Sequence, residues 1–212
     1  MIGLFLLVAG THFAALLSPG PDFFLLIRAA LLHGRRQADG CAAGIALANL
    51  LSMLLVLLAL AALPGANGGL WRTLQLVGGG YFCWLGSQAL LARRELQLPD
   101  GAGDGETGET GGRWRAGFGQ GLLASSLNPK LPLFYAGLFG VLREAAVPGW
   151  GLALAMAWMA AVVLGWDLAL VRLLGRASWR GWLRRRVRTL DRLCGALLLA
   201  LGGWLLVTAV PG

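Results

Sequence analysis

The chain has 212 residues, of which 57% are hydrophobic and 13% are charged, and its mean hydropathy is +0.69. Soluble domains usually carry about 25% charged residues and lack several long apolar runs, so this composition excludes an ordinary soluble enzyme. The net charge of +8 is no sign of nucleic-acid binding, because the basic residues gather at the ends of apolar segments.

Six apolar segments are long enough to cross a bilayer, which requires about 20 residues for a helix. They cover residues 3–27, 40–63, 70–91, 117–142, 150–174 and 193–210. Together they use most of the chain and leave no room for a soluble catalytic domain. The sequence therefore predicts an all-α membrane protein with six transmembrane helices and no enzymatic activity.

The first segment is interrupted by the run Ser18-Pro19-Gly20-Pro21-Asp22. The two prolines remove two backbone donors, and the glycine between them permits a sharp bend. Carbonyl groups freed in this way must face protein, water or a ligand within a bilayer. We predict that all of these residues except Ser18 belong to a substrate site, where Asp22 binds substrate or a proton. In the alternative interpretation, Asp22 caps the restarted helix and pairs with Arg28.

The second segment contains Asn49, for which we predict an interhelical hydrogen bond, with pore lining as the alternative. After the third segment, residues 92–116 are rich in glycine and acidic residues and predict a mobile cytoplasmic linker. This linker divides the chain into two units, 1–91 and 117–212, with three apolar segments each.

The fourth segment contains Lys130, which is the only lysine of the chain and follows Asn128 and Pro129. A cation within a hydrophobic span costs at least about 2.5–3.5 kcal/mol and usually marks a functional site. We predict that Lys130 lies opposite Asp22 and that both contribute to a substrate site, together with Asn128 and Pro129. The structural alternative is an ion pair that holds the two broken helices together.

The two proline breaks occupy corresponding positions in the two halves. Ser18-Pro19 aligns with Asn128-Pro129 at an offset of 110 residues. Because three segments per half is an odd number, two repeats of this kind would lie inverted in the membrane, which is a recurrent transporter architecture. The sequence therefore predicts two inverted three-helix repeats in which helices 1 and 4 are broken by proline.

The fifth segment contains Asp167, five residues before Arg172. A substrate ligand and a surface salt bridge are equally good interpretations of this residue. Of the seventeen arginines, fifteen fall on one side of a six-span arrangement. By the positive-inside rule this side is cytoplasmic, so both termini are predicted to be periplasmic in a bacterial cytoplasmic membrane.

The cysteines and histidines give no sign of a thiol or metal site. Cys41, Cys83 and Cys194 are isolated and are expected to serve as small packing residues. His12 and His33 have no partner at metal-ligand spacing. We therefore predict no metal and no cofactor.

These residues resemble the lysine exporter (LysE/RhtB) family of bacterial amino-acid efflux proteins. The most specific similarities are Ser18-Pro19-Gly20-Pro21-Asp22 in the first segment and Leu127-Asn128-Pro129-Lys130 in the fourth. Two weaker similarities are the glycine-rich run 76–86 in the third segment and the run 190–195 at the entry to the sixth.

The resemblance implies export of amino acids or their derivatives, driven by a proton gradient or the membrane potential. The expected partners are therefore a small-molecule substrate, protons and the lipid bilayer, and a homodimer is left open. The alternatives are an exporter of a different small solute and a non-transporting accessory membrane subunit.

Overall fold

The computed structural model describes residues 2–18, 20–62, 68–91, 110–128 and 130–209. Within these ranges the chain is helical and contains no strand. The helices are α1 (Ile2–Leu17), α2 (Pro21–Arg28), the π-helix η1 (Ala29–His33), α3 (Arg35–Ala61), α4 (Gly68–Leu91), α5 (Thr110–Ser126), α6 (Lys130–Glu144), α7 (Gly149–Leu174) and α8 (Ala177–Ala209). The prediction of an all-α protein is confirmed for this part of the chain.

Three of these helices are long and apolar enough to cross a membrane. They are α3, α7 and the Arg185–Ala209 part of α8. The segments Gly3–Leu17 and Pro21–His33 form a fourth candidate that is bent by 53°. These helices expose large apolar side chains on their outer surfaces, for example Leu55 (65%), Leu58 (66%) and Leu154 (64%), as helices in contact with lipid do.

Both predicted helix breaks are present. α1 ends at Leu17 and α2 begins at Pro21, while α5 ends at Ser126 and α6 begins at Lys130. The second break lies inside the predicted fourth span, so residues 117–142 are divided between α5 and α6. The count of six spans stays a prediction.

Helix α5 begins earlier in the sequence than the predicted segment 117–142. It starts at Thr110, so the end of the predicted linker 92–116 is helical, and residues 92–109 lie outside the described part of the chain. The physical reason is packing, because the backbone of Gly40 in α3 lies directly against the backbone of Trp114. This contact between Gly40 and Trp114 stabilises helical structure before Gly117, where the predicted segment begins.

Among the described helices, the most extensive packing joins α3 to α5 and α4 to α8. In the first pair, Gly40 opposes Trp114 and Gly44 opposes Phe118 and Leu122, so the residue numbers rise together and the two helices run parallel. A side chain at either glycine would collide with the backbone of the partner helix. Small residues permit this backbone approach in membrane helices.

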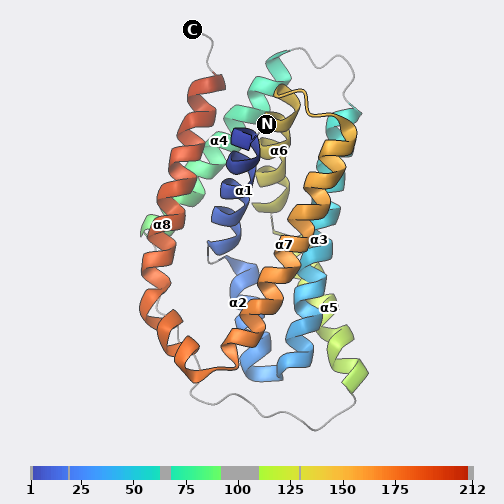
Figure 1. Ribbon diagram of the computed structural model, residues 1–212, viewed down its shortest axis with the longest axis vertical. Helices are drawn as coiled ribbons and strands as arrows, with labels where there is room; N and C mark the ends of the chain where they lie inside the picture. Colours follow the sequence, from blue (N-terminus) through green and yellow to red (C-terminus); the bar gives the residue numbers. More distant parts are fainter. Residues whose placement is uncertain (1, 19, 63–67, 92–109, 129, 210–212) are drawn as a thin grey trace.

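The second close pair has the opposite direction. Gly79 opposes Gly202 and Gly86 opposes Gly195, so α4 and α8 run antiparallel. Figure 1 shows that α1 begins and α8 ends at one end of the molecule, whereas α2 ends and α3 begins at the other. Helices α1, α2 and α6 pack against these two close pairs.

The buried apolar residues form two clusters at different heights. One cluster joins α2, η1 and the start of α3 to the end of α7 and the start of α8, with Leu26, Ala38 and Leu174 at its centre. The other joins α1, the end of α3, α6 and the start of α7, around Met53 and Tyr135. The breaks in the chain lie where these two clusters meet.

Candidate functional site

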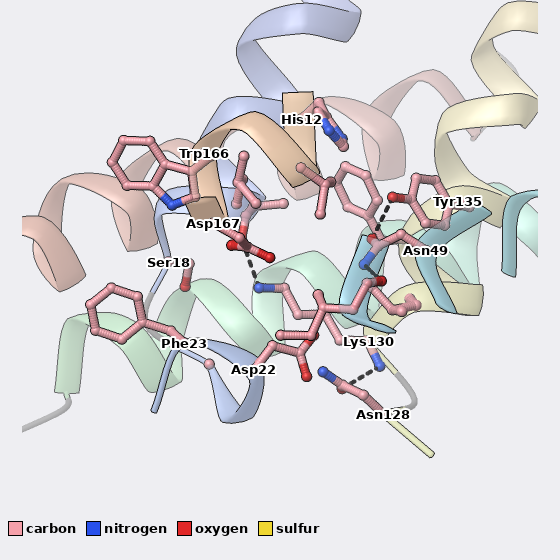
Figure 2. A pocket seen from close by; sticks show the side chains of 17 residues that line it. His12, Ser18, Asp22, Phe23, Asn49, Asn128, Lys130, Tyr135, Trp166 and Asp167 are labelled. Atoms are coloured by element: carbon pink, nitrogen blue, oxygen red, sulfur yellow. Dashed lines mark hydrogen bonds between the residues drawn. The ribbon is translucent and has the colours of Figure 1, made fainter. Parts of the chain in front are cut away.

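A cavity of about 60 Å³ lies between the two apolar clusters, at the level of the helix breaks. At about 10–15 Å³ for each water, this volume corresponds to roughly four to six water molecules. Figure 2 shows the lining side chains, which come from α1, α2, α3, α6, α7 and the residues at both breaks. Gly20 lines the cavity, and the lining residues with polar side-chain atoms are His12, Ser18, Asp22, Asn49, Asn128, Lys130, Tyr135, Trp166 and Asp167.

Six of the nine residues that the sequence indicated for a site line this cavity. They are Gly20, Asp22, Asn49, Asn128, Lys130 and Asp167. Pro21 is the first residue of α2 and is exposed. Pro19 and Pro129 lie outside the described residues.

The ammonium group of Lys130 is bound by the end of α1. Its Nζ donates a hydrogen bond to the carbonyl oxygen of Ala15 at 2.7 Å. Ala15 lies four residues before Pro19, and a proline has no N–H to donate, so the Ala15 carbonyl lacks the donor that a regular helix supplies. The lysine therefore supplies a donor to a carbonyl that the sequence leaves without its helical partner.

Asp22 lies in the first turn of α2, directly after the break. Its Oδ2 accepts a hydrogen bond from the Ser125 hydroxyl at 3.0 Å, and its other oxygen is buried without a hydrogen-bond partner. A carboxylate at a helix N-terminus is also favoured by the helix dipole. Arg28, the alternative partner for Asp22, is exposed at the far end of α2.

Asn128 shapes the start of α6. Its Oδ1 accepts a hydrogen bond from the backbone N–H of Lys130 at 3.0 Å. This contact satisfies one of the N–H groups that a helix start leaves without a partner. Asn128 thereby fixes the position at which the Lys130 side chain leaves the backbone.

Asn49 connects α3 to α6. Its Nδ2 donates to the Ile45 carbonyl at 2.9 Å, and its Oδ1 accepts from the Tyr135 hydroxyl at 2.7 Å. The predicted interhelical hydrogen bond is confirmed. Asn49 also lines the cavity, and its role in lining a pore stays a prediction.

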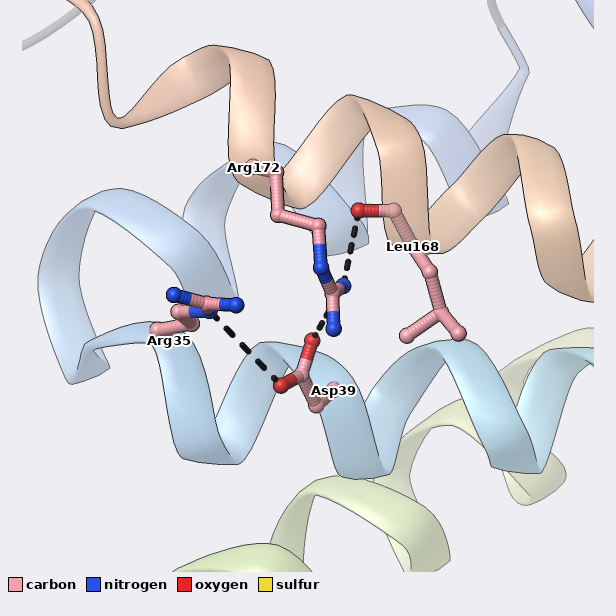
Figure 3. A network of polar contacts seen from close by, with 4 residues as sticks. All are labelled: Arg35, Asp39, Leu168 and Arg172. Atoms are coloured by element: carbon pink, nitrogen blue, oxygen red, sulfur yellow. Dashed lines mark hydrogen bonds and ion pairs between the residues drawn. The ribbon is translucent and has the colours of Figure 1, made fainter.

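Asp167 lies inside the molecule and is 7% exposed. Arg172, the partner expected from the sequence spacing, instead donates to Asp39 at 3.0 Å and to the Leu168 carbonyl at 2.9 Å, as Figure 3 shows. Asp39 also lies 4.0 Å from Arg35. The carboxylate of Asp167 therefore belongs to the cavity, and Arg172 belongs to a surface network at the ends of α3 and α7.

The cavity contains several polar atoms for which the protein offers no hydrogen bond. They are one oxygen of Asp22, one oxygen of Asp167 and both ring nitrogens of His12. A buried polar group without a partner costs about 1–3 kcal/mol, and more if it is charged. Such groups, gathered around one space, are suited to bind a small polar solute or water.

Sequence reasoning did not identify Ser125, His12, Tyr135 or Trp166 as site residues. Ser125 had a signal, because it lies 110 residues after Ala15, the same offset that relates the two proline breaks. The other three carry no motif. Their positions follow only from how α1, α6 and α7 pack around the breaks.

A cavity lined by two carboxylates and one ammonium, beside the breaks in the helices of an apolar bundle, is typical of membrane transporters. The LysE type translocator family matches residues 13–209. The chain belongs to this family, and it is therefore a translocator and not an enzyme. Membrane location follows from the family and from the apolar helices.

The chain is similar to several bacterial efflux proteins. The threonine efflux protein of Escherichia coli K12 is 33% identical over 174 residues, which cover 76% of this chain and 81% of the relative. The leucine efflux protein of Klebsiella pneumoniae is 29% identical over 124 residues, covering 58% and 56%. An uncharacterized membrane protein of Escherichia coli K12 is 28% identical over 161 residues, covering 74% and 67%. No solved structure matches the chain.

Proposed function

We propose that this chain exports amino acids across the bacterial cytoplasmic membrane and binds them in the cavity between its two helix breaks. The observation that carries this function is that Asp22 and Lys130, which start the second pieces of the two broken helices, line one buried cavity. Similarity to threonine and leucine efflux proteins supports the same substrate class.

The arrangement of charges fits a zwitterion. The free oxygen of Asp22 would accept a hydrogen bond from the substrate ammonium group. Lys130 and the N-terminal N–H groups of α6 would meet the substrate carboxylate, because a helix N-terminus carries partial positive charge. The cavity volume fits a small amino acid that displaces a few water molecules.

The described contacts support six spans in two inverted repeats. Six spans that alternate in direction place the second and fourth parallel and the third and sixth antiparallel. The glycine contacts give these directions for α3 with α5 and for α4 with α8. Each break also contacts the other, since Lys130 donates a hydrogen bond to Ala15 and Asp22 accepts one from Ser125. Ala15 and Ser125 are separated by 110 residues, the offset that relates the two proline breaks.

We place the ends of α2 and α7 and the starts of α3 and α8 in the cytoplasm. This end carries Arg28, Arg35, Arg36, Arg172 and Arg176, as the positive-inside rule requires. Both termini are then periplasmic. Energy for export would come from the membrane potential or a proton, and Asp22 and Asp167 are the carboxylates available in the cavity to carry that proton.

Counterflow of radiolabelled amino acids in proteoliposomes tests this function. We expect wild-type protein to exchange small neutral amino acids. We expect the exchange rates of Asp22→Asn and Lys130→Met to be at least about tenfold lower, since each change removes an intramembrane charge. Asp39→Asn and Arg28→Met are matched controls, because they remove one negative and one positive charge outside the cavity. Wild-type rates in both cavity variants would remove these residues from the mechanism.

The same preparation distinguishes the alternatives. A protein that exchanges no amino acid but moves another small solute would retain the transporter architecture and change the substrate. A protein that shows no flux alone and purifies with a membrane partner would be an accessory subunit.

A further inference from the structure

We propose that His12 recognises the side chain of the exported amino acid and selects a short side chain with a hydrogen-bonding group over its apolar isostere. This inference rests on the proposed amino-acid export and adds to it a residue that determines specificity. A short hydroxylated amino acid such as threonine is the expected substrate, and valine, which has nearly the same shape, is the substrate that His12 would discriminate against.

The first observation is the state of the imidazole ring. His12 is 3% exposed, lines the cavity, and makes no hydrogen bond through either ring nitrogen. A backbone group of Met159 lies near the ring, outside hydrogen-bond geometry. A neutral imidazole has one donor and one acceptor, which is the complement of a hydroxyl group that both accepts and donates.

The second observation is the wall around the ring. The centroids of Phe134, Tyr135 and Trp158 lie 6.1, 6.4 and 6.0 Å from the centroid of His12. The Tyr135 hydroxyl donates to Asn49. The space beside His12 is therefore walled by aromatic rings, and a solute that enters it finds the imidazole as a polar group with free capacity.

The third observation is the position of His12 relative to the charged groups. His12 precedes Ala15 by three residues in α1, which is a rise of about 4.5 Å along a helix. The Ala15 carbonyl holds the Lys130 ammonium, the group that meets the substrate carboxylate in the proposed function. The imidazole thus lies about one turn away from the carboxylate position, within reach of a short side chain.

These observations together predict discrimination. An apolar side chain beside His12 would displace water and leave the ring nitrogens without a partner, whereas a hydroxyl group would satisfy them. Sites built to hydrogen-bond a substrate hydroxyl reject the analogue that lacks it more strongly than a purely apolar site does. One neutral hydrogen bond corresponds to a preference of about twofold to tenfold for the hydroxylated substrate. The cost of leaving the ring nitrogens without a partner beside an apolar side chain increases this preference further.

Counterflow of threonine and valine by the same proteoliposomes tests the proposal. We expect wild-type protein to prefer threonine by about tenfold, and His12→Leu to bring the ratio near one by slowing threonine while valine is retained. His12→Gln keeps a donor and an acceptor and should restore part of the preference. Thr11→Val is the control, because Thr11 is a buried neighbour whose hydroxyl donates to the Leu7 carbonyl and does not line the cavity.

The outcomes separate this inference from the proposed function. Exchange of both amino acids with the same ratio in wild type and His12→Leu would overturn the role of His12 and leave amino-acid export intact. Failure of wild-type protein to exchange any amino acid would overturn the proposed function itself. If His12→Leu does not insert, competition on wild-type protein decides, because equal inhibition by threonine and valine contradicts the proposal.

Discussion

The Lys130 ammonium occupies the position of the backbone donor that the Ala15 carbonyl lacks, at 2.7 Å. One contact therefore completes the end of α1, places a positive charge beside the cavity and joins the two halves of the sequence. The compact ammonium group is suited to this position, because it has three donors and can serve a carbonyl and a substrate carboxylate at once.

This relationship predicts the effect of Lys130→Arg. Arginine keeps the charge, but its planar guanidinium is larger and cannot place one nitrogen at the Ala15 carbonyl without filling the cavity. We expect the variant to reach the membrane in normal amounts and to lose most of its counterflow activity. Wild-type exchange by this variant would show that the charge alone is required.

Ser125→Ala should weaken substrate binding. The Ser125 hydroxyl holds Oδ2 of Asp22 at 3.0 Å, and hydrogen bonds to charged groups contribute about 1.5–3 kcal/mol. We expect the substrate concentration for half-maximal counterflow to rise about tenfold, with rescue by Ser125→Thr. An unchanged concentration dependence would mean that the position of Asp22 is set by α2 alone.

Gly121→Ala should destabilise the protein. The backbone of Gly121 lies against the backbone of Cys41, and an added methyl group there would force α3 and α5 apart. Overpacking of this kind costs about 1–3 kcal/mol, which corresponds to a decrease in melting temperature of at least about 3 °C in detergent. Gly119→Ala on the same helix is the control, since no atom lies within 4 Å of its added carbon. Equal melting temperatures would contradict the close packing.

Tyr135→Phe removes the hydroxyl that joins α6 to Asn49 and leaves Oδ1 of Asn49 buried without this hydrogen-bond donor. A double-mutant cycle with Asn49→Leu isolates this pair, and unfolding in detergent measures it. We expect a coupling free energy of about 0.6–2 kcal/mol, because interhelical hydrogen bonds in membrane proteins are usually modest. Additive effects of the two changes would indicate that the pair contributes nothing.

Asp39→Asn should have little effect on stability. Asp39 and Arg172 lie 3.0 Å apart, but their side chains are 26% and 42% exposed. Exposed ion pairs contribute about 0.2–1 kcal/mol, so the melting temperature should change by less than about 4 °C. A larger decrease would show that the network in Figure 3 holds α3 and α7 together.

The predictions from sequence succeeded where a residue conflicts with its surroundings. The prolines beside Lys130 and Asp22 interrupt a helix in any surroundings, so the two helix breaks were predictable. Lys130 and Asp22 are ionisable groups in apolar segments, so their place in the lining of the cavity was predictable as well. The start of α5 was less predictable. The backbone contact between Gly40 and Trp114 that extends this helix joins residues far apart in the sequence.

The rest of the site depends on packing that no local pattern encodes. Arg172 lies five residues from Asp167, yet it pairs with Asp39, which is 133 residues away. Tyr135 meets Asn49 across 86 residues. A single histidine on an apolar helix carries no periodic signal, so His12 became a site residue only when α1, α6 and α7 were seen around one cavity.

The glycine contacts described above also bear on how the molecule could alternate between inward and outward access. Each close pair takes one helix from before residue 92 and one from after residue 109, so the contacts of α3 with α5 and of α4 with α8 join the two halves of the sequence backbone to backbone. We therefore expect α5 to move with α3 and α8 with α4, and the chain to bend at the two breaks, between α1 and α2 and between α5 and α6.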